Sequence, residues 1–228
     1  MDNVLHLIFS FAKTHHSADC SGHGFDHINR VHENALLLLR EYPKADAFIV
    51  RSAALLHDVD DRKMGTDGRI AADYLNTLSI DKKTKQHILD IINRIAFSTT
   101  GTTPNFSDIE TKIIFDADKL DAMGAMGINR SMMYGIKSGR PFFDPDIFPT
   151  QNLSVAEYKN ENRHEETTIN HFFDKLLKLK KLMQTDVGQR EAQKRHQFMV
   201  EYLTQFFKEE HQQKWIDFLN DYLKKEYP

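Results

Sequence analysis

Residues 53–63 of the 228-residue chain read AALLHDVDDRK, and this stretch decides how the rest of the sequence is interpreted. Four apolar residues lead directly into His57 and Asp58, and Asp60 and Asp61 follow at once. Burying such polar groups beside a core without a cation is costly in free energy. The stretch therefore predicts either a metal site or a solvated helix end, where the carboxylates would oppose the helix dipole.

Helical periodicity dominates the rest of the chain, because apolar residues recur at spacings of three and four. No strand pattern of any length accompanies it, so the sequence predicts an all-α fold organised as a single domain over residues 1–228. The expected helices cover residues 4–12, 26–42, 44–57, 68–78, 82–97, 107 through about 115, 155–184, 189–209 and 210–225.

The expected helix ends carry recognisable signals. Pro43 ends the second helix, and Asp67 is expected to cap the fourth. The segments SDIE at 107–110 and SVAE at 154–157 have the pattern of capping boxes. Between helices, KSGRPFFDPDIFPTQN at 137–152 holds three of the six prolines and predicts a long loop. Its aromatic residues either form one wall over a base together with Arg140 or anchor the loop to the core; they are Phe142, Phe143 and Phe148.

Composition narrows the class of protein. The net charge of −3 carries no basic excess for a nucleic-acid polymer or an anionic membrane. The single cysteine, Cys20, excludes an internal disulfide and is typical of a reducing compartment. The start of the chain lacks a signal-peptide pattern, and the run ALLLL at 35–39 is far shorter than the roughly 18 residues of a membrane helix. We expect a cytoplasmic protein.

Histidine and aspartate occur where several expected helices begin or end. His27 lies in GHGFDHINRVH at 22–32, and Asp118 and Asp121 lie in FDADKLDAMGAMG at 115–127, three apart and thus on one helix face. Together with His57 and Asp58, they form a donor set typical of a divalent first-row metal or zinc, with water in the open positions.

Three segments, GHGFDHINRV, AALLHDVDDRK and DADKLDAMGAMGINR, resemble in this order the motifs of the HD-domain phosphohydrolases. The resemblance is closest to the small bacterial stand-alone group that is nucleotide-pyrophosphohydrolase-like, and it continues through TINHFFDKLLKL and RHQFMVEYL. It implies an HD-type helical bundle with a core over about 20–135, completed by a loop and C-terminal helices over 136–228. Glycines at 124 and 127 admit close packing, which is as consistent with a structural as with a functional role.

The resemblance also implies a ligand set and a cofactor. His27, His57, Asp58 and Asp118 are implied to bind one divalent ion, for which Mn²⁺, Mg²⁺, Co²⁺ or Ni²⁺ is expected and Zn²⁺ or Fe²⁺ stays open. Asp121 is the alternative to Asp118, or else a group behind the ligands or a substrate contact. His87 is the only histidine between Asp58 and Asp118. HD enzymes with two metals usually carry further histidines in that interval, so the resemblance favours one metal over two and disfavours a paired-iron oxygenase. A second metal stays open through His23 or His87.

Catalytic and substrate-binding candidates surround these ligands. Related HD hydrolases carry an acidic pair after the motif, which suggests Asp61 and Asp60 for orienting water. On a continuing helix Asp61 would face the same side as His57 and Asp58. His23 is a further ligand, a phosphate contact or a turn residue. The candidate substrate contacts are Lys63, Arg30, His23, Asp121, Lys119, Arg130 and Lys175.

The leading hypothesis is a metal-dependent phosphohydrolase that acts on nucleotides and releases pyrophosphate from (deoxy)nucleoside triphosphates. The alternatives are a phosphomonoesterase acting on nucleoside monophosphates, a non-catalytic metal- or nucleotide-binding sensor, and a helical interaction protein. The expected partner is a small phosphorylated substrate, with neither a nucleic-acid polymer nor a membrane, and a homodimer stays open.

Overall fold

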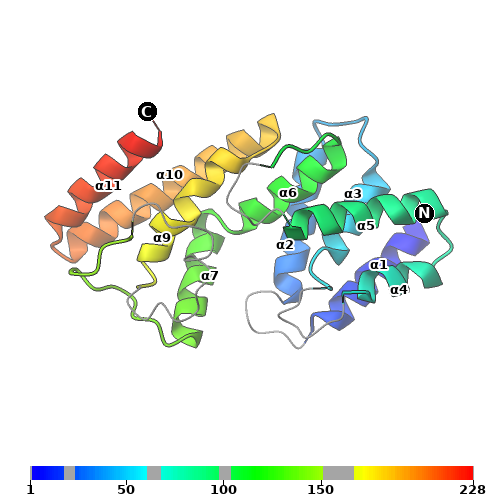
Figure 1. Ribbon diagram of the computed structural model, residues 1–228, viewed down its shortest axis with the longest axis horizontal. Helices are drawn as coiled ribbons and strands as arrows, with labels where there is room; N and C mark the ends of the chain where they lie inside the picture. Colours follow the sequence, from blue (N-terminus) through cyan, green and yellow to red (C-terminus); the bar gives the residue numbers. More distant parts are fainter. Residues whose placement is uncertain (1, 18–23, 61–67, 98–103, 151–166, 228) are drawn as a thin grey trace. The chain divides into compact units, whose positions relative to one another are not determined.

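The computed structural model describes residues 2–17, 24–60, 68–97, 104–150 and 167–227, and over these ranges every regular element is a helix (Figure 1). This confirms the all-α prediction. The chain divides into two compact units. The first comprises Met1–Asp121 and Met183–Gln189, and the second comprises Ala122–Leu182 and Arg190–Pro228. The single-domain organisation expected from the sequence stays a prediction.

In the first unit, α3 is the central helix. It packs against α1, α2, α5 and α6, and α2 also packs against α6. All residues of α3 except Ala47 and Arg51 are buried, as expected for a helix that is apolar on all sides. The bounds are α1 Asp2–His15, α2 Phe25–Leu39, α3 Ala47–Leu56, α4 Ile70–Thr77, α5 Lys82–Phe97 and α6 Ile109–Asp121.

Aspartates cap α3 and α6. Asp46 accepts hydrogen bonds from the amides of Phe48 and Ile49, so α3 begins at Ala47 and not at residue 44. At α6, the amide of Thr111 donates to Oδ2 of Asp108 at 3.0 Å. The capping box expected from Ser107 is therefore wrong, because Asp108 takes the capping position. Its other carboxylate oxygen is held by Arg94 at 2.7 Å.

The second unit contains α7 (Gly124–Lys137), α9 (Asn170–Asp174), the 3₁₀ helix η2 (Leu176–Leu182), most of α10 (Asp186–Glu209) and α11 (Gln213–Glu226). The sequence did not predict α7. Gly124 has φ +65°, a conformation that favours glycine, and a Cβ at Gly127 would overlap the carbonyl of Ala122. The backbone therefore explains the presence of glycine at both positions.

The long helix predicted over 155–184 is wrong in its described part. The backbone leaves the helical region at Lys175 (φ −137°, ψ −59°), which separates α9 from η2. Leu176 and Leu179 are both buried, and their spacing of three matches the three-residue turn of a 3₁₀ helix. The capping box at 154–157 lies outside the described residues.

The predicted loop at 137–152 is anchored by aromatic packing over its described part. Trp215 of α11 is completely buried, and the ring of Phe148 stacks on it with centroids 4.4 Å apart. Phe143 meets the same ring edge-on, and the indole N–H of Trp215 donates to the carbonyl of Pro145 at 3.0 Å. These contacts favour the anchoring alternative for the aromatic residues of the loop.

A buried carboxylate fixes the segment Met183–Gln189 within the first unit. The amides of Gln184 and Thr185 and the hydroxyl of Thr185 all donate to Asp116, at 2.8, 2.8 and 2.6 Å. Burial raises the pKa of Asp116 to about 6, although these hydrogen bonds act to lower it. Gly188 approaches so closely that any Cβ there would overlap this carboxylate.

Asp116→Ala is expected to lower the free energy of unfolding by roughly 3 kcal/mol, because several buried donors would lose their acceptor. Urea denaturation at a pH well above 6 measures this loss. Asp73→Ala is the matched control, since Asp73 is exposed in the first turn of α4, and it should change the stability by less than about 0.5 kcal/mol. Equal losses in the two variants would contradict the role given to Asp116.

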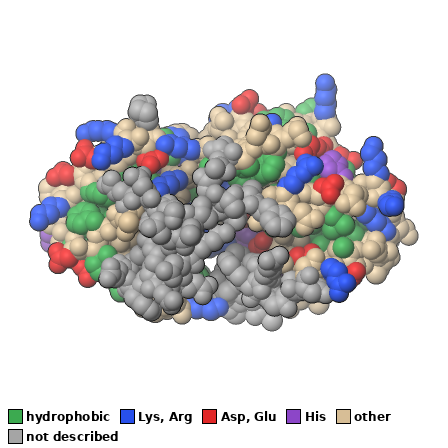
Figure 2. All heavy atoms as spheres, in the orientation of Figure 1, with side chains coloured by type: hydrophobic (Ala, Val, Ile, Leu, Met, Phe, Trp, Pro, Cys, Tyr) green, Lys and Arg blue, Asp and Glu red, His purple; other side chains and the backbone are tan. Residues whose placement is uncertain are grey.

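The surface has mixed character. On the face shown in Figure 2, acidic and basic side chains are interspersed with hydrophobic ones. Exposed apolar residues include Met133, Tyr134 and Ile136 of α7, and dimerisation stays a prediction. Within the described ranges, none of the helices combines the length and the apolar character needed to span a membrane.

Candidate metal centre

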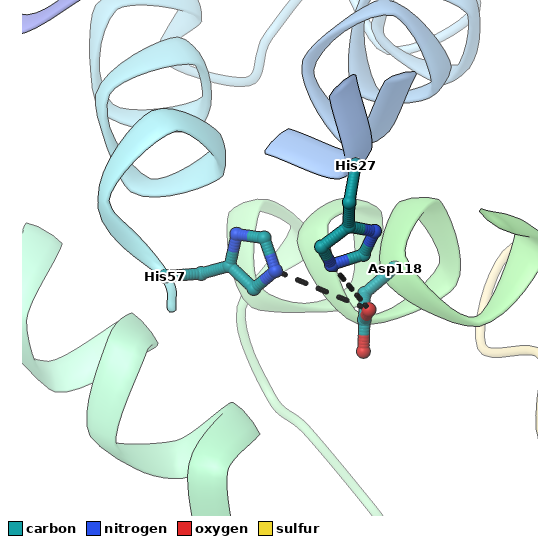
Figure 3. Close-up of side chains that lie close together, drawn as sticks. All are labelled: His27, His57 and Asp118. Carbon is teal, nitrogen blue, oxygen red and sulfur yellow. Dashed lines mark ion pairs between the residues drawn. The ribbon is translucent and has the colours of Figure 1, made fainter. Parts of the chain in front are cut away.

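Three potential ligands from three elements converge in the first unit. His27 is in the first turn of α2, His57 follows the last residue of α3, and Asp118 lies on α6. The packing of α2 against α3 and α6 brings them together. One potential ligand atom from each lies within 4.8 Å of the other two. Figure 3 shows the two rings and the carboxylate pointing toward one another.

Each of the three side chains is held by an atom that faces away from the centre. Nδ1 of His57 lies 2.9 Å from the carbonyl oxygen of Ala54, to which it must donate because a carbonyl only accepts. Nδ1 of His27 likewise donates to Asp121 at 2.7 Å. Lys119 donates to Oδ2 of Asp118 at 2.8 Å. Second contacts of this kind orient metal ligands in proteins.

The atoms that remain face one another. Nε2 of His27 lies 3.7 Å and Nε2 of His57 lies 4.0 Å from Oδ1 of Asp118. Nε2 of His57 is buried and makes no hydrogen bond with any part of the protein that the structure describes. Because Nδ1 carries the proton, this nitrogen has a free lone pair. Such a set of two imidazole nitrogens and a carboxylate fits a divalent cation.

Asp58 lies beside this group. Its Oδ2 is 3.3 Å from Nε2 of His27, and its Oδ1 is 3.6 Å from Nε2 of His57. All four residues predicted as ligands are thus neighbours. Burial would raise the pKa of Asp118, but Lys119, His57 and His27 outweigh it and hold this pKa well below its ordinary value. The carboxylate therefore stays ionised.

The residues after Asp58 depart from the expected helix. Helix α3 ends at Leu56, and residues 57–60 form turns. The carboxylate of Asp60 accepts hydrogen bonds from the amides of Ile70 and Ala71, at 2.7 and 3.3 Å, and so caps α4. The sequence assigned this cap to Asp67 and gave Asp60 a role toward water. Four residues with predicted roles lie outside the described residues. They are the site residues Asp61, Lys63 and His23 and the predicted cap residue Asp67.

The remaining substrate candidates differ in their surroundings. Arg30 forms an ion pair with Asp121, and Lys119 pairs with Asp118 and lies 5.1 Å from the ring centroid of Phe115. Arg130 and Lys175 belong to the second unit. The proposed role of Arg130 and Lys175 as phosphate contacts stays a prediction.

His16 is a buried histidine that the sequence analysis did not single out. It is 1% exposed, and neither ring nitrogen has a hydrogen-bond partner in the described structure. Burial and His15 lower its pKa to about 4, while Asp58 acts in the opposite direction. Its burial could have been predicted, because Ile8, Ala12 and His16 follow one another at a spacing of four and all three are buried.

A second group of potential ligands consists of His87, Asp108 and Glu110. Their carboxylates already have partners, since Asp108 binds Arg94 and caps α6, and Glu110 accepts the amide of Asp46 at 2.9 Å. The guanidinium of Arg94 would also repel a cation. The His27, His57 and Asp118 group is therefore the better candidate.

No protein-family model matches the chain. Solved structures match it over nearly its whole length. A crystal structure of an HD-superfamily hydrolase from Bacillus thuringiensis is 35% identical, with a TM-score of 0.73, and the match covers 93% of this chain and 99% of that chain. A crystal structure of a Lactobacillus plantarum protein is 34% identical, with a TM-score of 0.78 and coverage of 92% and 97%. The chain belongs to the HD superfamily of hydrolases.

Among its relatives is YpgQ of Bacillus subtilis, an uncharacterized protein that is 33% identical over 196 residues, 84% of this chain and 86% of YpgQ. A crystal structure of YpgQ in complex with ADP is 30% identical, with a TM-score of 0.68, and the match covers 90% of this chain and 97% of that chain. The similarity to HD-superfamily hydrolases supports the assignment of this chain as a metal-dependent phosphohydrolase. The HD fold implies a divalent cation, and the donor set described above fits one.

Proposed function

We propose that this chain hydrolyses nucleoside triphosphates to the monophosphate and pyrophosphate, with one divalent cation held by His27, His57, Asp58 and Asp118. The observation that carries the proposal is the inward set of donor atoms. Nε2 atoms of two imidazoles and one oxygen of Asp118 converge, with the carboxylate of Asp58 beside them. Nε2 of His57 is buried there and has no hydrogen-bond partner among the described residues. Buried polar atoms normally have partners, so a missing partner needs an explanation.

A bound divalent cation supplies Lewis acidity toward phosphate oxygens and lowers the pKa of a water toward about 7. The chain's own residues supply the rest. Lys119 holds one oxygen of Asp118 and leaves the other directed inward. Asp61 is the proposed acceptor of the water proton, on the basis of its place after the HD motif. Lys63 is a proposed phosphate contact on the same basis.

The proposed reaction is the attack of water on the α-phosphorus. A new P–O bond forms to the water oxygen, and the bond between the α-phosphorus and the bridging oxygen breaks, so that pyrophosphate leaves with the bond's electron pair. The proton of the water passes to the Asp61 carboxylate. A nucleotide is proposed because the relative YpgQ has been crystallised with ADP, which like the proposed substrate has a base, a sugar and an α-phosphate in sequence.

With Mn²⁺, the chain is expected to convert a nucleoside triphosphate into equal amounts of monophosphate and pyrophosphate. Product masses measure this outcome, and a reaction in ¹⁸O-labelled water locates the attack. Label in the monophosphate indicates attack on the α-phosphorus, whereas label in pyrophosphate indicates attack on the β-phosphorus.

The matched control for this reaction is Asp118→Asn protein purified in the same way, which should form no product. Release of orthophosphate alone from both mono- and triphosphates would make the chain a phosphomonoesterase and overturn the pyrophosphate proposal. Saturable nucleotide binding without any product, at full metal loading, would instead indicate a sensor.

A further inference from the structure

We propose that Arg30 and Asp121 are a positioning pair for His27. The pair determines which ring nitrogen of His27 faces the metal centre. Arg30 then acts through Asp121 and does not bind substrate phosphate. The metal-binding consequence of this inference rests on the proposed function. Its structural part, the protonation pattern of the His27 ring, holds for the protein by itself.

The contact between His27 and Asp121 determines the tautomer of the ring. Nδ1 of His27 lies 2.7 Å from Oδ2 of Asp121, and the two side chains are 2% and 1% exposed. An ionised carboxylate can only accept, so Nδ1 must carry a hydrogen. A neutral imidazole then has its lone pair on Nε2, which is the nitrogen that lies 3.3 Å from Asp58 and 3.7 Å from Asp118.

Arg30 supplies the positive charge and the hydrogen bonds that a carboxylate needs at this depth. A buried carboxylate is expensive unless it is paired and hydrogen-bonded. Nε of Arg30 donates to Oδ1 at 2.6 Å, and Nη2 donates to Oδ2 at 3.2 Å, which is the two-bond geometry that a guanidinium provides and an ammonium cannot. Asp121 is also the last residue of α6, where a cation is favoured by the helix dipole.

This arrangement has two consequences for the site. Two of the three guanidinium nitrogens of Arg30 are committed to Asp121, which argues against the role of phosphate contact that its position in the sequence suggested. His27 is also anchored differently from His57, whose Nδ1 donates to the neutral carbonyl of Ala54. Of the two histidine anchors, only that of His27 is a side chain, and it can therefore be altered without changing the ligand itself.

Asp121→Asn is the sharpest perturbation of the pair. The introduced side chain has one oxygen that accepts and one amide that donates. Arg30 only donates, so it competes with Nδ1–H of His27 for that single oxygen, and its charge gives it the advantage. The amide then faces Nδ1, which must accept, and the ring hydrogen moves to Nε2. That hydrogen would block the nitrogen that points into the centre.

The first measurement is the tautomer of His27 in metal-free protein, read from long-range ¹H–¹⁵N NMR correlations of the histidine rings. The chain has 12 histidines, so the His27 signals are assigned by their loss in His27→Gln. At a pH where the His27 ring is neutral, wild-type protein should show a protonated Nδ1 and an unprotonated Nε2. Asp121→Asn should shift the hydrogen to Nε2, whereas Asp73→Asn, an acid-to-amide change at an exposed position of the same unit, should leave the spectrum unchanged.

The second measurement is Mn²⁺ affinity, obtained by competition with a chelator. Asp121→Asn should bind Mn²⁺ about 10- to 100-fold more weakly, the usual effect of losing a contact behind a metal ligand. Arg30→Lys keeps the charge and loses the two-bond geometry, so it should weaken Mn²⁺ binding by a smaller factor. At saturating Mn²⁺, both variants should keep the wild-type KM for the nucleotide, because neither residue is proposed to touch it.

An unchanged tautomer in folded Asp121→Asn would overturn the inference. So would Arg30→Lys protein that shows a raised KM together with wild-type Mn²⁺ affinity, because that result would make Arg30 a substrate contact. If Asp121→Asn does not fold, the Mn²⁺ affinity and the KM of Arg30→Lys decide the question. Failure of the proposed function is recognised separately, since wild-type protein would then show the expected tautomer but no Mn²⁺ binding or no product.

Discussion

His57→Ala protein is expected to hold no divalent cation at the centre and to lose turnover, while its helical content stays that of the wild type. Nε2 of His57 is one of the inward donor atoms and has no hydrogen-bond partner among the described residues. Removing it leaves too few ligands for a stable site. The core should survive, because α3 is buried through its apolar residues and His57 lies beyond its end.

Metal content per chain, circular dichroism and turnover together test this expectation. His57→Ala should also unfold more easily than wild type in the presence of metal, because a cation that binds only the folded state stabilises it. This difference in the free energy of unfolding should disappear when both proteins are measured without metal. His87→Ala is the matched control, because His87 lies in the second group of potential ligands and is 35% exposed. It should retain both metal and turnover. Full metal stoichiometry in a protein carrying His57→Ala and Asp58→Ala would show the ligand assignment to be wrong.

The fold was predictable from the sequence wherever one helix face is consistently apolar. The prediction for 82–97 coincides with α5, and Ile88, Ile91 and Ile95 of that helix are all buried. The period of the apolar residues is a local property, so it can be read without knowing the neighbours. The gathering of His27 with His57 and Asp118 was likewise predicted, because the sequence segments that carry them resemble the HD motifs.

Features that depend on contacts between distant segments were not predictable. Arg30 lies three residues after His27 on α2, and only the packing of α2 against α6 shows that it reaches Asp121. The break at Lys175 interrupts a segment whose leucines suit an α-helix and a 3₁₀ helix alike. The tautomers of His27 and His57 also follow from their partners, which lie 94 residues away in one case and three in the other.

The two aspartates after Asp58 show the same limit. The argument for Asp61 over Asp60 assumed a helix that continues past Asp58, but α3 ends at Leu56. What now separates the pair is the hydrogen bonding of Asp60. Both of its oxygens accept backbone amides at the start of α4, which gives this carboxylate a structural task. Asp61 lies outside the described residues and is the proposed proton acceptor.

Asp61→Asn is expected to keep its metal and its stability and to lose rate by about 10²- to 10⁴-fold, the usual contribution of a positioned general base. Asp60→Ala should show the opposite pattern. Loss of the cap on α4 should lower the free energy of unfolding by about 0.5–2 kcal/mol and leave most of the rate. Turnover at saturating Mn²⁺ and urea denaturation of both variants measure the two effects. Asp60→Asn keeps one acceptor oxygen and should fall between wild type and Asp60→Ala in stability. If Asp60→Asn loses more rate than Asp61→Asn, the roles of the two aspartates must be exchanged, because the carboxylate that caps α4 would then also serve the reacting water.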